Sequence, residues 1–295
     1  MTTLEAIVNS TTYPLHDVDG DLVWIGEDGW GMAPTQRLTD RGPLQHGDSD
    51  LDFRLHPRLG MLKLLAQAST IAGHWDIRKQ LLKIFRPSRT PITLRWTLDN
   101  GDVRQIDVHY AGDLTFSSED RLGYSQKAVV QLRAADPTFY DPTLQTITYG
   151  VGGGTGVFAF PLSWPASFGS STVNQTRTIA YAGTWRTYPV VIIKGPITNP
   201  VITNLTTGDK LDLTGTTITT GDSYTIDCRP GVKTVVDASG SNRIDKLSDD
   251  SDLATFSLEA DGEAALGLND IKVTGTGANA TTEVYLQFHT RYIGI

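Results

Sequence analysis

The sequence has little of what marks several large classes of protein. It contains one cysteine, Cys228, among 295 residues, which excludes an intramolecular disulfide and a zinc site built from several cysteines. It has no run of about 18 apolar residues, the length that a membrane helix needs. Its 25 Lys and Arg are outnumbered by 33 Asp and Glu, so the overall positive charge of a nucleic-acid-binding protein is missing. Residues 1–5 lack the basic and apolar regions of a secretory signal, and we expect a protein made in the cytoplasm.

What the sequence does contain favours β-structure. Hydrophobic residues make up 39% of the chain, which is enough to build cores and excludes disorder for most of it. The 29 glycines and 14 prolines favour short strands separated by turns over long helices. A length of 295 residues corresponds to about two domains. We therefore expect a mainly β protein with two domains.

One segment of the first half has a helical period. Ile77, Leu81 and Ile84 recur at helical spacing, and charged residues occupy the positions between them. Pro87 then ends the pattern. The sequence predicts one α-helix, at about residues 74–86.

The rest of the first half reads as strands and turns. Apolar and polar residues alternate over 92–98 and 106–110 around Asn100-Gly101, which predicts a β-hairpin. A second hairpin is expected over residues 13–25, around Asp19-Gly20. Residues 26–50 are rich in glycine and proline and predict a long irregular loop, of the kind that a neighbouring subunit could order. Further strands are expected within 53–68 and 128–134.

A glycine run at residues 150–156 predicts a linker or a tight strand crossover. We place the domain boundary there, with one domain over 1–149 and the other over 150–295. Short strands at regular spacing follow the glycine run, and they predict a β-sandwich. They are expected at residues 190–194, 201–205, 210–213, 223–229, 233–236, 254–258, 271–274 and 283–290.

Charge is segregated within the first half. Residues 17–52 hold nine acids and two bases, whereas residues 53–104 hold ten bases and three acids. One interpretation is two solvated faces within one domain. The other is an acidic arm that docks on the basic region of a neighbouring subunit. The inter-subunit contacts would then involve acids of the loop and bases of the helix, namely Asp48, Asp50, Asp52, Arg78, Lys79 and Lys83.

No motif predicts a catalytic, metal or cofactor site. The acids of residues 17–28 lack the glycine and the glutamate of a calcium loop, and prolines follow the glycine run where a dinucleotide site needs a helix. The aromatic residues best able to stack on a sugar or a partner are Trp164, Phe168, Trp185 and Tyr188. A sandwich core also needs such residues, and this is the interpretation we favour. The sequence favours a structural or binding protein over an enzyme.

Segments along nearly the whole chain have counterparts in one known family. They are residues 41–47, His56-Pro57-Arg58, the helix with Arg86-Pro87 after it, the Asn100-Gly101 hairpin, and residues 132–142, 188–196, 199–208 and 291–295. The most specific are Ala135-Asp136-Pro137-x-x-Tyr140 and Asn199-Pro200-x-Ile202-x-Asn204. In the sequence and order of these segments, the chain resembles the distal tail protein of long-tailed, non-contractile bacteriophages. Residues 259–269 depart from the family pattern, because they are longer and more acidic than its short turn.

The resemblance implies a fold and a function. It implies an N-terminal β-rich domain with one helix that forms a hexameric ring, and a C-terminal galectin-like β-sandwich. The ring would lie at the tail tip of the virion, where it would join the tail tube to the tail-tip hub and to receptor-binding or side-fibre proteins. The genome could pass through its channel without sequence-specific contacts, and no membrane and no cofactor are implied.

Two functions of other classes stay open. One is a carbohydrate-binding adhesin that recognises the host surface through the C-terminal domain. The other is a sugar hydrolase, which needs paired carboxylates in a cleft. The densest acids, at residues 245–252, lie in a Ser/Asp-rich segment and are expected to be solvated.

Overall fold

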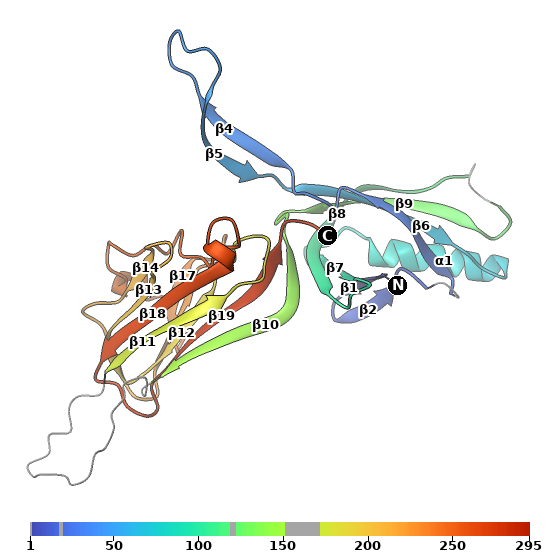
Figure 1. Ribbon diagram of the computed structural model, residues 1–295. Helices are drawn as coiled ribbons and strands as arrows, with labels where there is room; N and C mark the ends of the chain where they lie inside the picture. Colours follow the sequence, from blue (N-terminus) through green and yellow to red (C-terminus); the bar gives the residue numbers. More distant parts are fainter. Residues whose placement is uncertain (1, 18–19, 119–121, 151–171) are drawn as a thin grey trace, which may run out of the picture. The chain divides into compact units, whose positions relative to one another are not determined.

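The computed structural model describes residues 2–17, 20–118, 122–150 and 172–295 (Figure 1). The chain forms two compact units, one of residues 1–142 with 292–295 and the other of residues 143–291. The division at 142–143 lies before the expected boundary at 149–150. Strand β10 (Phe139–Gly150) crosses this division, and most of its residues belong to the second unit. The glycine run, from residue 151 on, lies outside the described residues.

In its described residues, the first unit is an antiparallel β-structure with one helix. Its strands pair in the order β2-β1-β7-β8-β9-β6-β3. The long strand β8 pairs with β7 up to Val108 and with β9 from His109 on, so it belongs to both halves of this sheet. The elements are β1 (Thr3–Val8), β2 (Thr11–Pro14), β3 (Leu22–Asp28), β4 (Thr35–Asp40), β5 (Ser49–Leu55), β6 (Arg58–Ala66), α1 (Ile71–Ile84), β7 (Ile92–Thr97), β8 (Val103–Phe116) and β9 (Gln126–Ala134).

Helix α1 confirms the predicted helix and begins three residues earlier. Thr70 precedes it, and the Thr70 hydroxyl accepts a hydrogen bond of 3.1 Å from the backbone N–H of Gly73, which satisfies one free donor of the first turn. Ile77, Leu81 and Ile84 are buried and join the core of the first unit. The helical spacing places these three side chains on one face of α1, and that face packs on the core of the first unit.

The hairpin predicted around Asn100-Gly101 is confirmed as β7–β8. Its register pairs Leu94 with Ile106 and Ile92 with Val108, and all four side chains are buried. Gly101 has a φ of 89°, which is a conformation that favours glycine in a tight turn. The alternation in the sequence thus identifies both strands and the face that they bury.

The hairpin predicted over residues 13–25 is wrong. Tyr13 and Pro14 belong to β2, which pairs with β1 through a turn at Asn9 and Ser10, both with positive φ. Strand β3 pairs with β6 instead. The N–H of Asp17 donates to the carbonyl oxygen of Leu22 at 2.9 Å, but the strands on either side of residues 17–22 have different partners.

The irregular loop predicted over residues 26–50 is also wrong. Residues 35–40 and 49–55 form the antiparallel hairpin β4–β5, which Figure 1 shows extending away from the other strands of the first unit. Strand β4 holds a single apolar residue, Leu38, and so gives no strand signal, whereas apolar residues do alternate with charged ones over 51–55 of β5. The segment 53–68 accordingly splits into the end of β5 and the whole of β6.

The second unit is a β-sandwich, as predicted. One sheet has the order β17-β16-β12-β19-β10, and the other has the order β11-β18-β13-β14 with β15 beside β13. Apolar residues from both sheets form one core. The strands are β11 (Val173–Ala180), β12 (Val190–Lys194), β13 (Ile197–Asn204), β14 (Lys210–Asp212), β15 (Thr217–Ile218), β16 (Ser223–Asp227), β17 (Thr234–Asp237), β18 (Leu268–Thr276) and β19 (Glu283–Tyr292), with 3-10 turns η1 (Ile244–Lys246) and η2 (Ala265–Gly267).

Most of the strands expected in this unit are present, and β12 has the predicted bounds. The strand expected at residues 254–258 is wrong, because that segment makes only a single bridge, between Leu258 and Thr187. Strand β11 was not expected. None of the helices in the described part of the chain is long and apolar enough to span a membrane.

Candidate functional site

The β4–β5 hairpin is exposed along both of its strands. No side chain of either strand is buried. Leu44, at the tip, is 100% exposed, and Leu51 in β5 is 68% exposed. A two-stranded hairpin without a packed face is marginally stable alone in water. Its apolar side chains therefore suit it to contact with another molecule.

The two faces of this hairpin differ. Residues paired across antiparallel strands point to the same side, so Arg54 lies beside Gln36 and Asp52 lies beside Leu38. A bulge follows, and Asp40 continues the same face beside Ser49. This charged face thus has a base near the root of the hairpin and two acids toward its tip. On the opposite face the guanidinium of Arg37 lies 5.7 Å from the centre of the Phe53 ring.

Three acids were predicted to reach a neighbouring subunit, and all of them lie on or beside this hairpin. Asp48 forms an ion pair of 3.2 Å with Arg41 within the tip. Asp52 accepts a hydrogen bond of 2.7 Å from the backbone N–H of Phe53. Asp50 is exposed, opposite Thr39. All three predicted acids therefore lie on or next to this hairpin, and Arg41 balances the charge of Asp48 within the hairpin.

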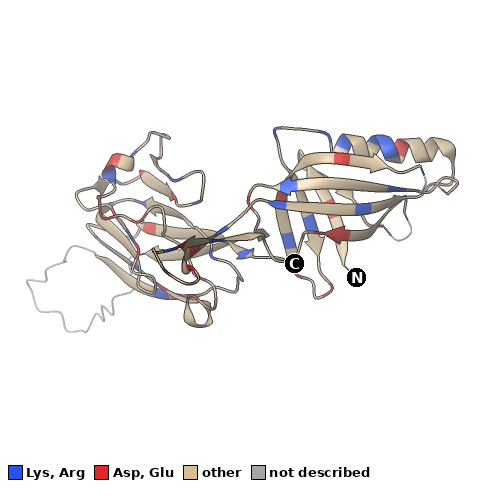
Figure 2. Cartoon of the chain, turned by 90° about the horizontal axis from the view of Figure 1, so that it is seen from above, with Lys and Arg blue, Asp and Glu red and all other residues tan. Residues whose placement is uncertain are grey.

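The bases predicted as their partners lie on α1, but two of them have contacts within the chain. Arg78 donates to the Gln126 side chain at 2.8 Å, and its guanidinium lies 4.1 Å from the centre of the Phe116 ring. Lys79 forms an ion pair of 3.2 Å with Asp76, and Figure 2 shows basic and acidic bands together on this helix. Repulsion among three bases on α1 is thus relieved in part without a second subunit.

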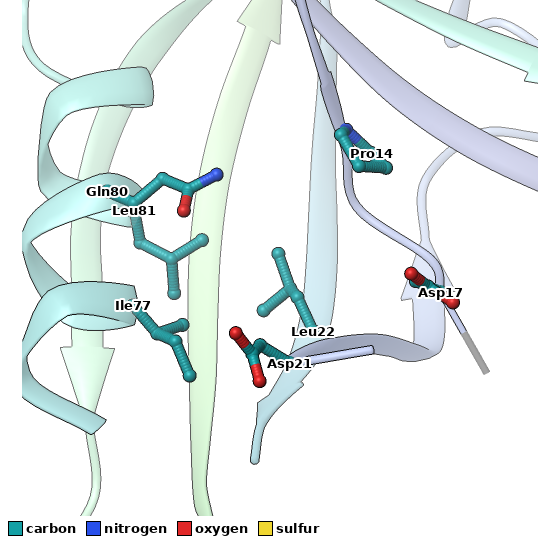
Figure 3. Close-up of a pocket in the computed structure, with 7 residues that line it drawn as sticks. All are labelled: Pro14, Asp17, Asp21, Leu22, Ile77, Gln80 and Leu81. Atoms are coloured by element: carbon teal, nitrogen blue, oxygen red, sulfur yellow. The ribbon is translucent and has the colours of Figure 1, made fainter. Parts of the chain in front are cut away.

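Lys83 lies at the edge of a hollow of about 180 Å³ between the end of α1 and the β1–β2 hairpin. A second hollow, of about 200 Å³, lies farther back along α1 and is bordered by the other end of β2 (Figure 3). Its lining combines apolar side chains with the two acids Asp17 and Asp21. The first hollow is lined by Val8, Asn9, Thr11, Tyr13, Lys83, Ile84 and Arg86, and the second by Pro14, Asp17, Asp21, Leu22, Ile77, Gln80 and Leu81.

Arg58 is a fully buried cation, and no pattern in the sequence predicts its burial. Its guanidinium donates to the carbonyl oxygens of Gly29, Gly31, Pro137 and Ile293 at 2.8–3.0 Å. Burial lowers the pKa of Arg58 from its usual value. The side chain joins the β3–β4 connection to the last residues of the chain, so it holds the root of the exposed hairpin in place.

The aromatic residues proposed for stacking are only partly described. Trp164 and Phe168 lie outside the described residues. Tyr188 is partly buried and packs against the core of the second unit. Trp185 is half-buried, and its backbone carbonyl accepts a hydrogen bond of 2.7 Å from the Tyr181 hydroxyl. Sugar stacking by this set stays a prediction.

The described residues assemble no site of obvious chemistry. Within them, no three His, Cys, Asp or Glu side chains come close enough to hold a metal ion together. Cys228 is buried, and burial raises the pKa of its thiol to about 12, so it is not an activated nucleophile. What the described structure offers is a set of surfaces for contact.

Comparison with known proteins finds a solved structure with a similar fold. No protein-family model matches this sequence, and no curated protein sequence matches it either. Among solved structures, the Dit protein of phage SPP1 superposes with a TM-score of 0.66, at 12% sequence identity and with 98% of each chain covered. The chain has the Dit fold. This confirms, for the fold, the resemblance to distal tail proteins.

The Dit-like fold extends over both units, since the superposition covers nearly the whole of each chain. The mainly β architecture with a single α-helix in the described residues agrees with it. The baseplate of phage P2, solved in its activated conformation with Ca, superposes with a TM-score of 0.49 at 10% identity over 97% of this chain and 98% of that one.

Proposed function

We propose that this protein is a structural adaptor at the tip of a bacteriophage tail, without enzymatic activity. The observation that carries the proposal is the superposition over 98% of both chains on SPP1 Dit, which is described as a paradigm of the hub adsorption apparatus in phages that infect Gram-positive bacteria. In this role six copies form a ring, which joins the tail tube to the tail-tip hub and to receptor-binding or side-fibre proteins.

The first unit supports the assembly part of this proposal. Its β4–β5 hairpin is ordered and fully outside the core, with Leu44 and Leu51 exposed. Such a hairpin gains stability when a partner covers it. In a ring of identical copies each hairpin meets the same surface of the next copy, which is the head-to-tail contact that closes cyclic assemblies.

Mass measurement and electron microscopy of the purified full-length protein test the proposal. We expect a closed ring with the mass of six chains. A monomer at all accessible concentrations would contradict the ring. A monomer that is retained on host glycans would favour the carbohydrate-binding adhesin instead.

A further inference from the structure

The surface that receives the hairpin can be argued from charge and shape. The two hollows described above follow one another along the junction of α1 with the β1–β2 hairpin, which we name the α1–β2 seam. One end of the seam carries Asp17 and Asp21, and the other carries Lys83 and Arg86. Its charge therefore changes sign along its length.

The charged face of the β4–β5 hairpin also has a base at one end and acids toward the other, over a similar length. Arg54 lies level with Gln36 and is four strand positions from Asp40, which corresponds to about 13 Å. The helix residues that line the seam run from Ile77 to Ile84, which corresponds to about 10 Å. A base and acids on the hairpin are thus spaced to meet acids and bases along the seam.

The seam also has room for an added element. Strand β2 ends the sheet order of the first unit, so one of its edges has no strand partner within the described residues. Leu15 donates its N–H to Leu4 of β1, and by the alternation of a strand the backbone of Thr12 faces the open side. Leu22 and Ile77 keep a small exposed apolar area in the second hollow, against which the half-buried Leu38 of the hairpin's charged face can pack.

We propose that the β4–β5 hairpin of one copy docks in the α1–β2 seam of the next copy. Arg54 then lies against Asp17 and Asp21, and Asp40 and Asp52 lie against Lys83 and Arg86. This inference rests on the proposed ring and names its contact surface. It departs from the pairing expected from the sequence, because Arg78 and Lys79 take no part in it.

A charge-swap experiment on the full-length protein tests the docking. Asp21→Arg and Arg54→Asp each place like charges together, and we expect each to raise the dissociation constant of the assembly about five- to tenfold. Combining the two reversals in one chain should recover most of the loss, because the pair is restored in the opposite sense. Lys79→Glu is the matched control on α1 and should leave the assembly unchanged.

Cross-linking gives a second readout. Full-length Asp21→Cys and Arg54→Cys chains, distinguished by a size tag, are coexpressed and treated with a short bismaleimide, and we expect a heterodimer band on a denaturing gel. Cys228 is buried and does not compete. Asp76→Cys with Arg54→Cys is the control and should give no such band.

The outcomes separate the two proposals. An intact ring with no recovery in the double reversal and no specific cross-link would overturn the docking site and leave the adaptor standing. A protein that never associates would overturn both.

Discussion

Two hairpins of the first unit, β7–β8 and β4–β5, differ in an instructive way. In β7–β8 the apolar side chains alternate inward, and Leu94, Trp96, Ile106 and Val108 are all buried. In β4–β5 no side chain is buried. Burial of apolar area stabilises the first hairpin within its own chain, whereas the second has no such burial. The same local structure thus serves the fold in one place and, in the function proposed above, assembly in the other.

Trp96→Ala should have the largest effect on the fold. The Trp96 ring lies 5.2 Å from that of Trp30 and 5.6 Å from that of Phe139, and its Nε1 donates to Glu27. We expect a loss of about 3–5 kcal/mol in the free energy of unfolding, since a buried cavity replaces the ring. Chemical denaturation measures it. Leu51→Ala in β5 is the matched change in the exposed hairpin and should stay within about 0.5 kcal/mol.

Arg58→Ala should come next. It removes a fully buried cation and the donors for four carbonyl oxygens, and we expect a loss of about 3 kcal/mol in the free energy of unfolding. Arg54→Ala, four residues earlier in β5, removes an exposed cation and should leave unfolding unchanged. Equal effects of the two changes would mean that burial does not distinguish the hairpin from the core.

Asp237→Asn tests a carboxylate of the second unit through its pH dependence. The Ser239 hydroxyl, and then Arg243, hold the pKa of Asp237 at about 2, below its ordinary value of 3.8. A lowered pKa in the folded state contributes stability that is complete above about pH 4 and lost as pH falls to about 2. The variant should lose this part of the pH dependence in denaturation measured from pH 5 to 2. An unchanged slope would contradict the assignment.

The smallest effect is expected at the hairpin tip. The ion pair of Arg41 with Asp48 is exposed on both sides, so Asp48→Ala should change the free energy of unfolding by less than about 0.5 kcal/mol. Raising the salt concentration should not enlarge the difference, because exposed pairs are screened. A loss above 1 kcal/mol in thermal or chemical unfolding would show that the tip is stabilised within its own chain.

How much could be predicted from the sequence depends on where each element finds its partner. Helix α1, β7–β8 and β12 were predicted because their apolar periods face a core that the same chain supplies. The β4–β5 hairpin was missed because segments such as Thr35–Asp40 have no apolar alternation, and a solvated strand looks like a loop. The hairpin over residues 13–25 was wrong because a local turn does not decide which strands pair.

The candidate site was predicted only in part, for the same reason. Charge segregation alone pointed to Asp48, Asp50 and Asp52 but not to Asp40, and the contact of these acids with a neighbouring subunit stays a prediction. The role of Arg58 could not be seen, because its carbonyl partners come from positions as distant as Gly29 and Ile293. The α1–β2 seam is lined by residues of the helix and of the β1–β2 hairpin together, so no single segment signals it.

The most direct test of the account is the mass of the assembly with and without the exposed hairpin. Residues 36–54 are replaced by a short Gly/Ser linker, and the mass of this variant is compared with that of the full-length protein at the same concentration. We predict a ring for the full-length protein and a monomer for the variant, whose circular dichroism and unfolding stay close to normal because the hairpin contributes nothing to the core. A variant that still forms the ring would contradict the claim that β4–β5 is the assembly arm.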